Sequence, residues 1–320
     1  MSTLARSLLP LSPASAAPDV KEEYGRRVAG LCRAFAGLPC LRGLPPDQRW
    51  FDARDFVYLL RQLNELSAAA GRGGVFDGAM LAAALGRNFQ TISPGAYAVI
   101  VRSFFTEVGL PGPDAAACAP RTLEHLRAAL RAEARPEQAA NAPFRHVLLV
   151  DRTSTEVALD GVLRRLRDDA PGGVVVVSLS EFAEDNEMSR QTECLAQIQT
   201  AVQLGRVIVI VNSLPLQSSL YALLNRHYML MPKHSGARAA AAALAAAAAA
   251  AGGGDGGVGG GADAGGGYDA CVTMAIGAIS RSVRVHKDTR IIVHLPLAAV
   301  PLTPLPFLNR FERCVARALE

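Results

Sequence analysis

The sequence has few cysteines, and none of them shows the spacing of a metal site. Its six cysteines are spread over 320 residues, and no two of them form a C-x-x-C pair. This usage excludes a disulfide-stabilised scaffold and a zinc finger, and it fits a reducing compartment. We therefore predict that the cysteines are small buried apolar residues and that the chain holds no metal.

A strong excess of one charge and a long apolar run are also missing. The net charge is only +4 and charged residues make up 19% of the chain, so nothing marks a nucleic-acid binder. The longest apolar run is the alanine tract at 239–251, and alanine is too weakly hydrophobic for a membrane span. An apolar fraction of 50% over this length predicts one large or two ordinary globular domains, which we expect in the cytoplasm.

Two stretches have a composition of their own. Residues 1–20 are rich in Ser, Ala and Pro and contain no acid before Asp19. We predict a disordered leader, and an organellar transit peptide is the alternative that this composition leaves open. Residues 239–251 are almost all alanine and 252–267 almost all glycine, which predicts a low-complexity surface insertion over 236–268.

Residues 21–140 have apolar side chains at helical spacing, interrupted by clusters of proline and glycine. The clearest helix covers residues 51–67. Asp52 and Asp55 lie near its amino end, where the helix dipole favours negative charge. One face of this helix is an apolar stripe of Phe56, Leu59, Leu60 and Leu63. The region is predicted to be a helical bundle.

Residues 141–320 alternate short apolar runs with helical segments. The runs cover 147–150, 174–177, 207–211 and 290–294, and the helices cover 154–168, 188–204 and 216–230. This alternation predicts a parallel sheet that is buried on both faces, and therefore an α/β fold. Ligands of such sheets bind at the carboxyl ends of the strands, which directs attention to Asp151, Ser178, Asn212 and Leu295.

The motifs for nucleotide hydrolysis are absent. The sequence has no G-x-x-x-x-G-K-[ST] phosphate loop, and the segment 151–155 after the first run contains no glycine. Asn212 and Ser213 follow the 207–211 run, where a magnesium-binding Asp and a catalytic Glu are expected. We therefore predict no nucleotide site on this chain. The histidines stand singly, and we interpret His227, His286 and His294 as structural or surface residues.

Three segments occur in a recognisable order: 205–214 (GRVIVIVNSL) continued by 216–228 (LQSSLYALLNRHY), 283–293 (VRVHKDTRIIV) and 304–313 (PLPFLNRFER). In this order they resemble the AAA+ core of the mysterin-type giant E3 ubiquitin ligases, in which an H-x-x-F-R strand precedes a P-L-x-N-R-x-E helix. Residues 51–66 and 86–89 resemble the L-R-D-F-Y-S-L helix and the R-N-F segment of the family's helical lid. Thr289 departs from the pattern, since the family prefers an aromatic residue there.

The resemblance implies that residues 141–320 are a degenerate AAA+ unit with a P-loop NTPase-like sheet, and that 21–140 are the lid of the preceding unit. It also implies that ATP with magnesium, and zinc, are bound elsewhere in the family. The implied partners are neighbouring AAA+ units of the same polypeptide and the ubiquitin machinery. The sequence carries no RING-type ligand set, so ligase chemistry is not expected on these residues, and we interpret the chain as a fragment or a truncated gene model.

Arg310 is the residue to which the resemblance gives a catalytic role. An arginine in this N-R-F segment is implied to lie near a neighbouring unit's nucleotide, where an arginine finger accelerates phosphoryl transfer about 10³- to 10⁵-fold. The alternative, which we prefer, is that Arg310 pairs with carboxylates between packed units. Asn309, Glu312 and Arg313 are the further interface candidates.

Two functions stay open at this point. One is a catalytically incomplete AAA+ segment that packs against active ATPase units of a mysterin-like ubiquitin ligase. The other is an independent AAA+-shaped scaffold or adaptor that binds partner proteins.

Overall fold

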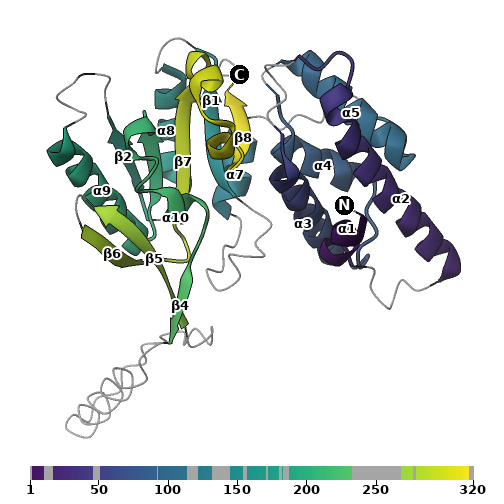
Figure 1. Cartoon of the computed structure of the whole chain (residues 1–320), viewed down its shortest axis with the longest axis horizontal. Coiled ribbons are helices and arrows are strands. Elements are labelled where there is room, and N and C mark those ends of the chain that lie inside the picture. The colour runs from purple at the N-terminus through teal and green to yellow at the C-terminus, as the bar shows by residue number, and fades with distance from the viewer. Residues whose placement is uncertain are drawn as a thin grey trace, which may run out of the picture.

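The computed structural model contains a helical half and an α/β half (Figure 1). It describes residues 2–10, 17–45, 51–91, 93–113, 122–131, 145–153, 157–170, 172–179, 182, 187–232, 268–276 and 279–316. The predicted insertion at 236–268 lies outside the described residues, apart from Tyr268, which begins a strand.

The helical half begins with α1 (Ser2–Leu8), α2 (Pro18–Gly37) and the short 3-10 helix η2 (Leu38–Cys40), followed by α3 (Ala53–Ala69), α4 (Gly78–Asn88) and α5 (Pro94–Val108). Polar side chains define where its helices start. Asp52 accepts a hydrogen bond from the backbone N of Arg54, and Asp55 accepts one from the backbone N of Asp52, which forms a capping box at α3. Asp77 and Ser93 cap α4 and α5, each by accepting a single hydrogen bond from a backbone N of the first turn.

The core of the helical half contains the predicted apolar stripe of α3, whose four side chains are fully buried. The first residues of the chain differ from the expected disordered leader, because residues 2–8 form α1. Ala5 and Leu9 are buried against the bundle, and the Tyr24 hydroxyl donates a hydrogen bond to the carbonyl of Leu9. Leucines within this segment give α1 an apolar face. The prediction of disorder rests on the average composition of residues 1–20, which does not show that face.

The α/β half is built on a five-stranded sheet in the order β2-β3-β7-β1-β8, and every pairing in it is parallel. Its strands are β1 (His146–Asp151), β2 (Val174–Ser178), β3 (Val207–Val211), β7 (Arg290–Pro296) and β8 (Phe311–Ala316). The four predicted apolar runs are β1, β2, β3 and β7, so the predicted α/β fold with a parallel sheet is confirmed.

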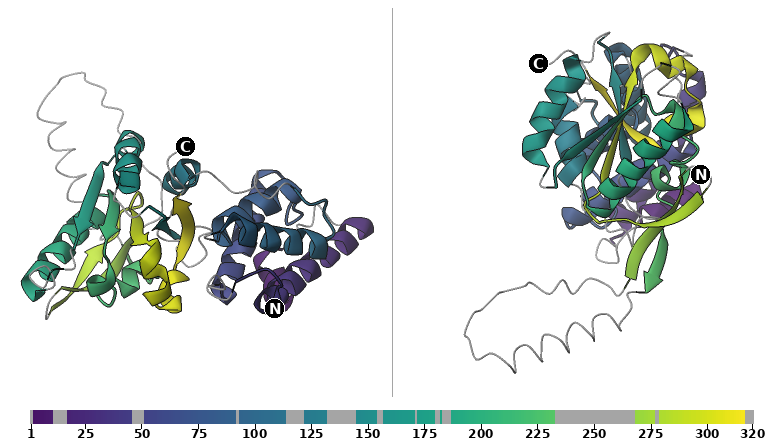
Figure 2. Two further views of the ribbon diagram at one scale, coloured as in Figure 1. Left: turned by 90° about the horizontal axis from the view of Figure 1, so that it is seen from above. Right: turned by 90° about the vertical axis from the view of Figure 1, so that its left-hand side faces the viewer.

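Both faces of this sheet are covered (Figure 2). Leu148 and Val150 of β1 pack on the side of α9 (Met188–Gln203). Val147 and Leu149 pack on the opposite side with α7 (Thr122–Arg131) and α8 (Val157–Asp169). The side of α9 also carries a small antiparallel sheet, β4-β5-β6, made of β4 (Met229–Pro232), β5 (Tyr268–Ile276) and β6 (Ile279–Arg284). The insertion therefore joins two paired strands, β4 and β5.

Two predicted helices are wrong. Residues 216–230 form the end of the 3-10 helix η6 (Leu214–Leu216), the single turn α10 (Tyr221–Leu224) and the start of β4. Arg226 has a left-handed backbone with φ 55°, which ends the helical run. After the 3-10 helix η7 (Leu297–Leu302), the motif at 304–313 is helical only in α12 (Leu305–Leu308). It continues as β8, because pairing with β1 completes the sheet.

Candidate functional site

A nucleotide is expected at the carboxyl edge of the sheet in this fold. The acidic residue at this edge, Asp151, already has hydrogen-bond partners within the chain. Asp151, at the end of β1, is 2% exposed. Its Oδ1 accepts hydrogen bonds from the backbone N of Thr153 at 2.7 Å and from Thr153 Oγ1 at 2.6 Å. Its Oδ2 lies 3.1 Å from Nε2 of the buried His294 on β7. Asp151 thus stabilises a local turn, and His294 has the structural position that we expected.

The other strand ends on this edge offer little chemistry. Ser178 is exposed at the end of β2, and Leu295 is buried in the core. Asn212 follows β3 with a left-handed backbone at φ 53°, which turns the chain into η6. Residues 154–156, within the expected phosphate-loop position, lie outside the described residues.

The described residues hold neither a cluster of metal ligands nor a membrane-spanning helix. In the part of the chain that the structure describes, no three His, Cys, Asp or Glu side chains gather in a way that could hold a metal ion. Within the same part, every helix is too short or too polar to cross a bilayer.

At the amino edge of the sheet, charged side chains form buried ion pairs with the helical half. Arg145, directly before β1, is 4% exposed. Its Nη1 lies 2.8 Å from Asp55 Oδ1 and donates to the carbonyl of Asn309 at 3.0 Å. Its Nη2 donates to Asn88 Oδ1 at 2.9 Å, and the guanidinium lies over the ring of Tyr58. One side chain therefore connects α3, α4 and the start of β8.

Arg313 on β8 binds the same carboxylate. Its Nη2 is 3.2 Å from Asp55 Oδ2 and also donates to the side-chain oxygen of Asn309, while Nη1 donates to the carbonyl of Asn88 at 3.3 Å. The Arg313 guanidinium lies 4.9 Å from the centre of the Phe51 ring. Asp55 thus stands between two buried arginines, and its single negative charge is shared by both.

Glu312 points to the other side of β8 and also meets the helical half. Its Oε2 lies 2.8 Å from Arg87 Nη2 and 3.3 Å from His125 Nε2. Its Oε1 accepts the backbone N of Arg145 at 3.0 Å and Gln62 Nε2 at 3.4 Å. Burial alone would raise the pKa of the Glu312 carboxyl, but the Arg87 charge and these hydrogen bonds lower the pKa to about 2. Burial lowers the pKa of His125, so at neutral pH a neutral His125 donates to the carboxylate.

We call these contacts the junction network; its members are Asp55, Gln62, Arg87, Asn88, His125, Arg145, Asn309, Glu312 and Arg313. The interface candidates Asn309, Glu312 and Arg313 all lie in it, between the two halves of this chain. Arg145 and His125 were missed by the sequence analysis. A charged residue directly before a buried strand is the signal that could have indicated Arg145.

Comparison with known proteins places the α/β half in a family. Residues 137–250, less than half of the chain, match the model of the RNF213 AAA domain. The α/β half is an AAA+ segment of the RNF213, or mysterin, type. The chain is also 24% identical over 270 residues to a Dictyostelium discoideum protein described as an uncharacterized transmembrane protein. That alignment covers 84% of this chain but only 4% of the Dictyostelium protein.

Residues from three of the segments that carry the resemblance to mysterin come together in this structure. Asp55 of the lid-like helix, Arg87 and Asn88 of the R-N-F segment, and Glu312 of the last motif are all members of the junction network. The segments 51–66, 86–89 and 304–313 therefore mark one polar contact between the helical half and the mysterin-type sheet, whereas 205–228 and 283–293 contribute no member to it. The three contributing segments do not surround the carboxyl edge, where Asp151 lies.

Arg310 lies beside the junction network and is not a member of it. Its guanidinium is 4.3 Å from the centre of the Tyr221 ring and 5.7 Å from that of Phe307. Among the described residues, no carboxylate forms an ion pair with it. Burial, opposed by Tyr221, lowers the pKa of Arg310 from its usual value. In this mysterin-type segment, Arg310 lines a cavity at the amino edge.

Proposed function

We propose that this chain is a catalytically incomplete AAA+ segment of a mysterin-like E3 ubiquitin ligase. In this proposal it packs against active ATPase units and supports ATP-driven ubiquitin transfer, without ligase chemistry on its own residues. The proposal rests on one observation, which is that both carboxylate oxygens of Asp151 already have partners within the chain. Its carboxylate is engaged by Thr153 and His294, and the sequence supplies no phosphate-binding motif beside it.

The junction network supports the packing role. Two buried carboxylates, Asp55 and Glu312, bind arginines from the helical half and from the α/β half. Removing one partner of such a buried pair typically costs about 3–5 kcal/mol, so the two halves resist sliding past one another. If the helical half is the lid of the preceding AAA+ unit, a movement of that lid is passed directly to this sheet.

The other parts of the ligase are proposed to lie elsewhere in the complete protein. ATP and magnesium belong to neighbouring units, and zinc belongs to a RING-type site outside these residues. Neighbouring AAA+ units are the proposed direct partners, and the cytoplasm is the proposed location.

The test compares substitutions at the two edges of the sheet in the complete protein that contains these residues. Asp151→Asn changes the position where an active unit would need its nucleotide-binding groups, and Glu312→Gln weakens the junction network. ATP hydrolysis and ubiquitin transfer are measured for both variants. We expect Asp151→Asn to keep both rates within about twofold and Glu312→Gln to lower both by roughly tenfold, which corresponds to about 1.4 kcal/mol.

The opposite pattern would overturn the proposal. If Asp151→Asn abolishes hydrolysis while the protein stays folded, this unit is itself an ATPase. If Glu312→Gln destabilises the chain but leaves both rates unchanged, the junction serves stability alone, and the scaffold function becomes the better explanation.

A further inference from the structure

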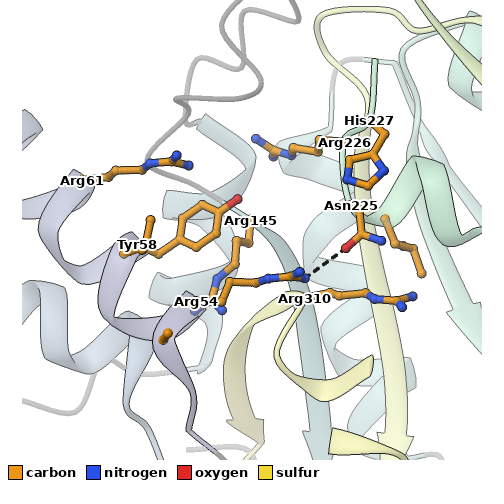
Figure 3. Close-up of a pocket in the computed structure, with 11 residues that line it drawn as sticks. Arg54, Tyr58, Arg61, Arg145, Asn225, Arg226, His227 and Arg310 are labelled. Carbon is orange, nitrogen blue, oxygen red and sulfur yellow. Dashed lines mark hydrogen bonds between the residues drawn. The ribbon is translucent and has the colours of Figure 1, made fainter. Parts of the chain in front are cut away.

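A cavity of about 330 Å³ lies at the amino edge of the sheet, between α3 and the turn that follows α10. Five arginines line it: Arg54 and Arg61 from α3, Arg145 before β1, Arg226 after α10 and Arg310 before β8. Figure 3 shows Arg61 and Arg226 pointing toward one another from opposite walls, with Tyr58 below them. Both halves of the chain therefore contribute positive charge to one space.

This charge is largely uncompensated. Arg145 has a counter-charge in Asp55 at 2.8 Å, which it shares with Arg313. The other four arginines form no ion pair with a described carboxylate, and no Asp or Glu of the described residues lines the cavity. Arg54 donates only to the amide oxygen of Asn225, at 3.0 Å, and Arg61 lies over the ring of Tyr58. Like charges held this close repel one another unless an anion joins them.

Arg226 gives the strongest indication that the anion is a ligand. Its side chain is buried, with 8% of the residue exposed, and its Nε has no hydrogen-bond partner among the described residues. Its backbone is in the left-handed region at φ 55°, a conformation that non-glycine residues adopt at a cost and that concentrates at functional sites. The Nε atoms of Arg61 and Arg145 are also buried without a partner. Buried cationic donors of this kind are costly unless they are paired.

We propose that this cavity binds a small molecule carrying two or more phosphate groups. The planar guanidinium fork matches phosphate oxygens in a bidentate manner, and several arginines together favour clustered phosphates over a single carboxylate. The volume falls in the range of about 300–1,000 Å³ that is typical of small-molecule sites.

This site is distinct from the nucleotide position of an AAA+ sheet. Arg145 and Arg310 stand before the first residues of β1 and β8, whereas ligands of parallel sheets bind beyond the last ones. Six residues of β1 at about 3.3 Å each separate the two positions by roughly 20 Å. The inference therefore does not depend on the proposed function. A ligand held by both halves would also strengthen the contact between them.

The test is a titration of the 320-residue chain by calorimetry at physiological ionic strength. Three probes share clustered phosphates and differ in source: inorganic tripolyphosphate, ATP without magnesium, and inositol hexakisphosphate. We expect saturable binding of at least one probe and a matching rise in the melting temperature. Binding of tripolyphosphate and ATP alike assigns the site to a linear phosphate chain, and binding of inositol hexakisphosphate alone assigns it to a phosphorylated ring.

Single substitutions locate the binding. Arg226→Gln and Arg54→Gln should each weaken it by about tenfold or more, because each removes a charge-assisted contact. Arg164→Gln, whose side chain is 80% exposed on α8, is the matched control and should leave binding unchanged. If Arg226→Gln fails to fold, Arg54→Gln on the exposed rim carries the test alone.

Either of two results overturns the proposal: no saturable binding of any probe, or equal binding by the Arg54, Arg226 and Arg164 variants. ATP binding that survives the arginine substitutions but is lost in Asp151→Asn would instead contradict the proposed function, so the two failures are distinguishable.

Discussion

At the carboxyl edge of the sheet, the buried Asp151 is held by Thr153 and His294, two residues of the α/β half itself. At the amino edge, the equally buried Asp55 binds Arg145 and Arg313, which come from the other half of the chain. The Asp151 carboxylate stabilises a local turn, and the Asp55 carboxylate connects the helical half to the α/β half. The edge where parallel sheets usually bind ligands is therefore self-contained in this chain, whereas polar connections and unpaired positive charge concentrate at the opposite edge.

The edge strand β8 explains why the amino edge differs. Among the strands that the structure describes, β8 pairs only with β1, yet all six of its residues are buried. The helical half covers its free side, and the backbone N of Val315 donates to Gln90 Oε1 at 3.2 Å. Covering an edge strand satisfies its unpaired backbone groups. The charged side chains of β8 are then buried too, and they need partners from the helical half.

The largest expected effect comes from breaking the amino edge at Asp55. In Asp55→Asn, the buried Arg145 and Arg313 lose their shared counter-charge, while the shape of the side chain is kept. We expect the free energy of unfolding to fall by about 3–5 kcal/mol, as measured by urea denaturation.

Asp160→Asn is the matched control, since the Asp160 side chain is 72% exposed and its loss should change stability by less than about 0.5 kcal/mol. A change below about 1 kcal/mol in Asp55→Asn would mean that the two arginines find other partners, and the contrast between the two edges would lose its basis.

The next effect concerns acid and His146, the first residue of β1 at the amino edge. Burial, followed by the Arg226 and Arg290 charges, lowers the pKa of His146 well below 6.5. Below about pH 6.5 the unfolded chain therefore binds a proton at this histidine that the folded chain does not. The stability that is present above pH 6.5 is lost as the pH falls. Below about pH 6 the loss approaches the slope set by one proton taken up on unfolding.

His146→Gln should remove this contribution, so that the variant loses less stability than the wild type between about pH 6 and pH 5. Urea unfolding at several pH values measures the slope. His125, whose pKa is also lowered, keeps part of the slope in the variant. Glu312 does not act in this window, because its lowered pKa makes its contribution disappear only below about 4.5, toward 2. Equal slopes in His146→Gln and in the wild type would exclude His146 as the source.

The sheet was predictable from the sequence because its strands carry their own signal. The run from Val207 to Val211 consists only of Val and Ile and is buried throughout, so its structure depends little on the rest of the chain. β8 was not predictable in this way. Glu312 and Arg313 interrupt its apolar pattern, and they are buried only because Arg87 and Asp55, far away in the sequence, provide the opposite charges.

The candidate site was predictable only in part. The last motif indicated Asn309, Glu312 and Arg313 as interface residues, although it gave no indication that the partner would be the helical half of the same chain. The arginine cavity had no local signal at all. Arg54 and Asn225 line it from α3 and from the turn after α10 and are 171 residues apart, so only the folded chain brings them together.

The smallest expected effect is at the carboxyl edge, where Asp151→Asn repeats the Asp55 substitution on a carboxylate that is buried to the same degree. The new amide oxygen can still accept from Thr153, and His294 loses a single charge-assisted contact. We expect a loss of about 1 kcal/mol by urea denaturation, close to the net value of one hydrogen bond. If Asp151→Asn instead costs as much as Asp55→Asn, then the carboxyl edge also depends on a buried charge pair. In that case burial alone, rather than the contact between the two halves, would determine how much each carboxylate contributes.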